Sequence, residues 1–103
     1  MQKKLCRAKI PNNNFHSNFE SFEILTIREY CGENGGTYFD EVRTTAQYLD
    51  NRNAYGDIFY RVFGMYKNKS PRIGKSLGDF NDVDDARNFI YDLTGIMPDI
   101  YSY

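Results

Sequence analysis

Nucleophilic and acid–base catalysis need a nucleophile, a base and an orienting group brought together in space. The chain contains a single histidine, His16, which lies in an asparagine-rich segment. A Cys–His or Ser–His pair would have to use this one imidazole, for example with Cys31 as the nucleophile. We therefore expect no enzymatic activity and assign no catalytic residue.

Metal and phosphate sites can be judged from spacing in the same way. Cys6 and Cys31 are too far apart for a CxxC knuckle and have no histidine beside them. The acidic run 79–85 lacks the glycine and the distal glutamate of a calcium loop, and its aspartates are typical of a helix start. The glycine-rich segment 32–36 is not followed by the Lys-Ser/Thr of a phosphate-binding loop. We expect no metal and no cofactor.

Length and charge set the class of protein. A chain of 103 residues predicts one domain, which buries roughly 60–70% of its unfolded surface. Nine tyrosines and eight phenylalanines supply either ordinary sheet residues or an aromatic contact surface. The net charge of −1 argues against a general nucleic-acid binder.

The amino-terminal residues bear on location. The first ten residues are basic but are followed by no apolar run, so we expect no signal peptide, and no apolar stretch is long enough to span a membrane. We therefore expect a cytoplasmic protein, in a bacterial host on the resemblance described below. In that compartment both thiols are expected to be reduced, with a Cys6–Cys31 disulfide as the alternative.

The carboxyl-terminal third predicts a ββα unit. Residues 58–63 are aromatic and β-branched and indicate a strand, 67–71 a turn, and 73–80 a returning strand. Asp82 can then cap a helix that Gly95 closes. This helix carries an apolar stripe that needs an apolar sheet face, either Phe59/Phe63 or Tyr60/Val62. The stripe itself comprises Val83, Ala86, Ile90 and Leu93, with Phe89 at its margin.

The rest of the chain is less regular. Residues 22–31 carry apolar side chains on both faces and predict a central strand. Segment 38–50 fits either a helix, with Thr37 and Asp40 as a capping box, or a strand that forms a hairpin with 22–31. Residues 1–20 are either a short strand followed by a linker or a loose basic arm. The fold class is therefore α+β: a single domain over 1–103, with an antiparallel sheet of three to five strands packed against one or two helices.

From Phe59 onward the chain resembles small accessory proteins of phages and mobile elements, including some type I-F anti-CRISPR proteins. The similarity covers about a third of the chain. It rests on strand, cap and helix positions, so it carries over no functional residue. It implies a virus-type inhibitor that occludes a host protein complex without chemistry. The matching residues are Phe59-Tyr60-Arg61-Val62-Phe63-Gly64, Gly78-Asp79-Phe80, and the stretch from Asp84-Asp85-Ala86 through Leu93-Thr94-Gly95.

The predicted function is a non-enzymatic inhibitor that binds and blocks a bacterial defence complex, a host protein or ribonucleoprotein such as a CRISPR effector. The alternative is a nucleic-acid-binding accessory protein that uses the basic turn near residues 67–75. Tyrosine and arginine often dominate binding energy, so we expect Tyr66, Lys69 and Arg72 to contact the partner, with Tyr60 as a lesser candidate. Reversing the charge of Lys69 and Arg72 is expected to leave thermal stability nearly unchanged.

Overall fold

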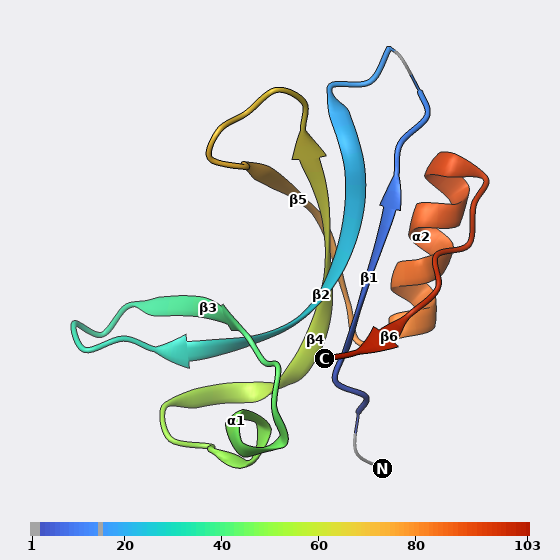
Figure 1. Cartoon of the computed structure of the whole chain (residues 1–103). Coiled ribbons are helices and arrows are strands. Elements are labelled where there is room, and N and C mark those ends of the chain that lie inside the picture. Colours follow the sequence, from blue (N-terminus) through green and yellow to red (C-terminus); the bar gives the residue numbers. More distant parts are fainter. Residues whose placement is uncertain (1–2, 15) are drawn as a thin grey trace.

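Two long strands, β2 (Phe19–Cys31) and β4 (Ala54–Tyr66), pair antiparallel through the middle of the molecule (Figure 1). Each has 13 residues, which corresponds to roughly 40 Å of extended chain. The computed structural model describes residues 3–14 and 16–103. The prediction of a central strand over 22–31 is confirmed, because β2 has neighbours on both sides.

The remaining strands extend this pair into an antiparallel sheet. β5 (Gly74–Phe80) lies beside β4, and β1 (Cys6–Pro11) pairs with the first half of β2. β6 (Tyr101–Ser102) adds to β1, and β3 (Thr37–Glu41) pairs with the second half of β2. Over the described residues the sheet has six strands, more than the three to five expected. The fold is α+β with the sheet dominant, and β6 after the last helix departs from a simple carboxyl-terminal ββα unit.

The last helix, α2 (Val83–Thr94), covers one face of the sheet (Figure 1). The carboxylate of Asp82 accepts a hydrogen bond from the backbone N–H of Asp84 at 2.8 Å, and Gly95 ends the helix with φ = 76°. Both predicted caps are confirmed. Ala86 and Ile90 are fully buried.

The core lies between α2 and one face of β1, β2 and β4. Tyr60 and Val62 point toward the helix, so by strand alternation Phe59 and Phe63 lie on the opposite face. Leu93, predicted to belong to the buried stripe, is instead 52% exposed. The apolar stripe of α2 therefore extends one turn past Ile90, to a position where the side chain no longer packs against the sheet.

Segment 38–50 is both strand and helix. It begins within β3 and ends just after α1 (Thr45–Leu49), so neither single prediction holds throughout. The capping box is formed by Thr44 and Gln47 rather than by Thr37 and Asp40. Between the two elements Val42 is fully buried.

The amino-terminal segment forms an inner strand where it reaches the sheet. Within β1, Cys6 and Ala8 are fully buried, so Cys6–Pro11 is not a loose arm. Met1, Gln2 and Phe15, which the same prediction covered, lie outside the described residues. Cys6 and Cys31 are free thiols, and the disulfide alternative does not occur. In the part of the chain that the structure describes, no helix has the length and apolar character to cross a membrane.

Truncation of Ile90 tests the packing of α2. Ile90→Ala should lower the free energy of unfolding by about 2–5 kcal/mol, because it removes fully buried methyl groups from the core. Urea denaturation measures this loss. Leu93→Ala, in the next turn of the same helix, is the matched control and should change stability by about 0.5 kcal/mol or less. Equal losses for the two variants would contradict the observed packing.

Candidate functional site

An open hollow of about 630 Å³ lies at the turn between β4 and β5. Its lining includes Tyr66 and Lys69, two of the predicted contact residues. The Tyr66 N–H donates to the carbonyl of Ile73 at 2.9 Å and closes the turn. The Lys67 N–H donates to the carbonyl of Asn18 and ties the turn to the β1–β2 loop. The lining residues are Asn18, Tyr66, Lys67, Asn68, Lys69 and Ile73.

Tyr66 is held in place by aromatic packing. Its ring lies 5.0 Å from the ring of Phe19, which also packs against Phe22 at 5.9 Å. Gly64 permits this arrangement, because a Cβ at that position would lie 2.8 Å from the Phe19 ring. The Tyr66 ring at the base of the hollow is therefore packed in place by the neighbouring strand residues.

The rim of the hollow combines apolar and basic groups. Ile73 is 50% exposed, and Lys69 is exposed without an ion pair among the described residues. Tyr66 and Ile73 together can bury apolar area, while Lys69 can attract an acidic group at the edge. This is the composition of a small interface centre with a charged rim.

Arg72 lies in the same turn but does not line the hollow. Its guanidinium binds the carboxylate of Glu23 at 3.1 Å and that of Glu20 at 3.7 Å. The Glu23 side chain is only 9% exposed, and it also receives Arg7 at 3.5 Å. Arg72 therefore helps to compensate a nearly buried carboxylate on β2, a structural role that the sequence interpretation did not include.

Tyr60 lies in the core with 2% of its surface exposed. Its hydroxyl donates to the carbonyl of Lys4 at 2.6 Å. Burial, with smaller contributions from Cys6 and Asp82, raises the pKa of Tyr60 to about 12. A partner cannot reach this ring in the folded protein, so the prediction that Tyr60 contacts one is withdrawn.

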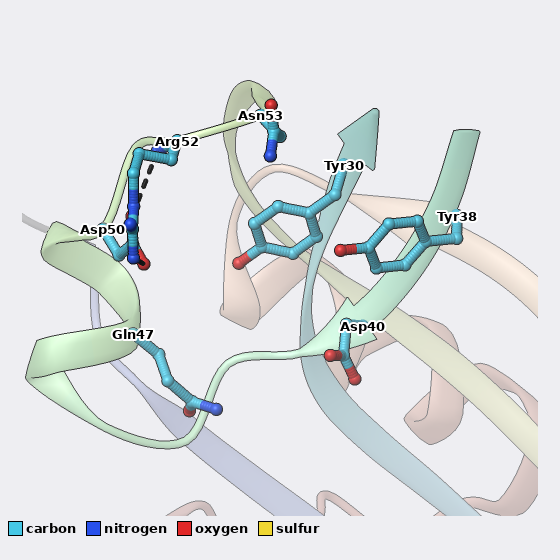
Figure 2. Close-up of a pocket in the computed structure, with 7 residues that line it drawn as sticks. All are labelled: Tyr30, Tyr38, Asp40, Gln47, Asp50, Arg52 and Asn53. Carbon is cyan, nitrogen blue, oxygen red and sulfur yellow. Dashed lines mark hydrogen bonds and ion pairs between the residues drawn. The ribbon is translucent and has the colours of Figure 1, made fainter. Parts of the chain in front are cut away.

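A second hollow, of about 320 Å³, lies at the opposite end of β2 and β4 (Figure 2). Tyr30 and Tyr38 are direct cross-strand partners whose rings stack at 5.5 Å with an interplanar angle of 24°. The sequence interpretation missed this site. Treating segment 32–36 as a hairpin turn would have placed the two tyrosines opposite each other. The hollow is lined by Tyr30, Tyr38, Asp40, Gln47, Asp50, Arg52 and Asn53.

Arg28 fixes the far wall of this second hollow. It is largely buried on β2, and its guanidinium donates to the carbonyls of Gly56 and Tyr48 and to the side-chain oxygen of Asn51. These bonds hold α1 and the loop after it against the central strands. The wall is therefore attached to the sheet by one side chain with three acceptors.

The groups considered for catalysis are far apart. His16 precedes β2 and is exposed, whereas Cys31 ends β2, so roughly 40 Å of strand separates them. Among the described residues, no group of three His, Cys, Asp or Glu side chains is arranged to hold a metal ion. Comparison of the chain with known protein families, with curated proteins and with solved structures gave no match.

Charge reversal at Arg72 should destabilise the folded protein, in contrast to the expectation from the sequence that thermal stability would hardly change. Arg72→Glu removes a partner of the nearly buried Glu23 carboxylate and places a like charge beside it, so unfolding should become easier by about 1–3 kcal/mol. Chemical denaturation provides the measurement. Lys69→Glu, in the same turn, should stay within about 0.5 kcal/mol of wild type. Two equally stable variants would show that the Arg72–Glu23 pair does not support the fold.

Alkaline unfolding tests the environment of Tyr60. Because its pKa is raised to about 12 in the folded state, the unfolded state releases this proton first, at its ordinary pKa near 10. Stability should therefore fall as pH rises from about 10 to 12. Tyr60→Phe should flatten that fall, while Tyr91→Phe, an exposed tyrosine on α2, should follow wild type. Urea titrations across this pH range that give parallel curves for all three proteins would contradict the assignment.

Proposed function

We propose that the protein is a non-enzymatic inhibitor that binds a bacterial defence complex, such as a CRISPR effector, and blocks it by occupying its surface. The observation that supports this proposal is the hollow of the β4–β5 turn, where Tyr66 and Ile73 form an apolar centre beside Lys69. Hot spots of binding energy are typically aromatic residues held in place within a small patch. The hollow offers such an anchor.

The preorganised position of Tyr66 favours binding. Packing against the tilted ring of Phe19 restrains Tyr66 before the partner arrives, so less side-chain entropy remains to be lost on binding. The partner surface that fits this hollow is apolar at its centre and acidic at its edge, where it meets Lys69. The inhibitory activity and the phage origin rest on the resemblance of the residues from Phe59 onward to anti-CRISPR proteins.

Nucleic-acid binding is the second candidate, favoured by the charge of 58–78. This segment has five basic side chains and no acidic one. Arg61 is paired with Asp79 at 2.7 Å and Arg72 with glutamates of β2, which reduces the charge available for phosphate. Lys69 and Lys75 have no ion pair among the described residues.

A phage-protection assay tests the first proposal. In a bacterium whose type I-F CRISPR effector targets an infecting phage, expression of the wild-type protein should restore plaques and capture the effector in a pull-down. Lys69→Glu combined with Ile73→Ser should weaken capture by about 2 kcal/mol or more, roughly thirtyfold in Kd, with the fold intact. Lys75→Glu is the matched control, since it removes an exposed charge of the same segment outside the hollow.

The outcomes separate the two candidates. If the double variant loses capture of the effector and the Lys75→Glu control keeps it, the hollow is supported as a protein-binding surface. Equal loss in the control, together with a gel shift that weakens steeply with salt, supports nucleic-acid binding. Failure of the wild-type protein to restore plaques or retain the effector would reject the inhibitor.

A further inference from the structure

The hollow between the β2–β3 hairpin and the loop after α1 contains phenol and carboxylate oxygens that have no partner in the part of the chain that the structure describes. Figure 2 shows the hydroxyl end of Tyr30 directed into the space between the hairpin and that loop, with Tyr38 beside it. Neither phenol oxygen has a hydrogen-bond partner among the described residues. Both can therefore donate to, or accept from, a ligand.

The two carboxylates of the hollow differ. Asp50 is engaged by the guanidinium of Arg52 at 3.0 Å, so these two charges compensate each other. Asp40 accepts a single hydrogen bond, from the backbone N–H of Glu41, and forms no ion pair among the described residues. Its second oxygen therefore remains available to a ligand.

The surrounding lobe is also acidic. Residues 29–57 contain six acidic and two basic side chains, a net charge of −4 in a chain whose net charge is −1. Both basic residues of this range are paired, Arg43 with Glu41 and Arg52 with Asp50. Arg28, whose guanidinium binds Tyr48, Asn51 and Gly56 of this lobe, adds a third positive charge and brings the net charge of residues 28–57 to −3. Burial raises the pKa of Tyr30; among the neighbouring charges Arg28 acts most strongly and opposes the rise, while Asp40 and Asp50 add to it. The net negative charge of the lobe favours a cation at the hollow.

We propose that this hollow binds a basic side chain, arginine or lysine, presented by a partner polypeptide. Its volume of about 320 Å³ suits one side chain better than a large ligand. A guanidinium or ammonium group can donate to the Asp40 carboxylate and to the phenol oxygens, in charge-assisted hydrogen bonds. Tyr38 and Leu49 are exposed on the same lobe and can contact the backbone around that side chain.

This site is independent of the proposed inhibitor surface. The hollow of the β4–β5 turn includes Tyr66, the last residue of β4, whereas the hollow proposed here includes Asn53, the residue before β4 begins. The two therefore lie at opposite ends of this long strand, whose course Figure 1 shows. Either site can therefore fail without the other. A second copy of this chain, presenting its own basic turn, is the competing occupant that an experiment must distinguish.

NMR titration of the full chain tests the site with N-acetyl-arginine N-methylamide as the probe. Saturable shifts should appear at the amides of residues 30, 38 and 53. The neutral isostere, N-acetyl-citrulline N-methylamide, should bind at least about tenfold more weakly, because it lacks the charge that Asp40 recognises. A pentapeptide with a central arginine should bind more tightly than the capped amino acid.

Two variants locate the interaction. Asp40→Asn keeps an oxygen for the Glu41 N–H and should lower the affinity about tenfold. Glu33→Gln removes a charge from the hairpin turn outside the hollow and should change it less than about twofold. Unchanged thermal midpoints and spectra show that both variants are folded.

Several results would overturn the proposal. They are equal binding of citrulline and arginine probes, equal effects of the two variants, or a pentapeptide that binds no better than the capped amino acid. Shifts at the hollow that grow with protein concentration alone would identify a second copy as the occupant and reject a separate partner.

Discussion

The pairing of β2 with β4 is the constraint on which the rest of the structure depends. Their register joins Phe19 to Tyr66 at one end and Tyr30 to Ala54 at the other. Each candidate binding hollow lies at one of these ends. The paired strands supply one wall of each hollow, Tyr66 in the first and Tyr30 in the second, and the adjoining turns and loops supply the rest of the lining.

β2 also carries the polar side chains that attach the loops. Glu23 forms ion pairs with Arg72 from the β4–β5 turn and with Arg7 from β1, and Arg28 donates to the carbonyls of Tyr48 in α1 and Gly56 in β4. Both side chains are nearly buried on a central strand, where an uncompensated charge is costly. Their partners therefore have to be in place, and this requirement links the folding of each end to the integrity of the central pair.

The sequence predicted those parts whose signals are local. The caps of α2, the central strand β2 and the turn after Tyr66 depend on a few neighbouring residues, and the structure confirms them. Segment 38–50 could not be predicted, because a five-residue strand followed by a five-residue helix is too short for either periodicity to prevail. The burial of Tyr60 depends on which face of the sheet α2 covers. The ion pair of Arg72 depends on Glu23, which is 49 positions away in the sequence. Neither relation can be found in a local sequence pattern.

Because the charges are unevenly distributed, the net charge of the chain does not indicate which partners each end can bind. The molecule is 43 Å along its longest axis, whereas the Debye length at physiological salt is about 8 Å. A charged group near one end therefore interacts mainly with the local charges of that end. The basic segment 58–78 and the acidic lobe 29–57 each keep their own field, although the whole chain sums to −1. A partner surface that carries an acidic edge and a basic side chain at matching separation would be oriented by both ends at once, which favours a single binding orientation.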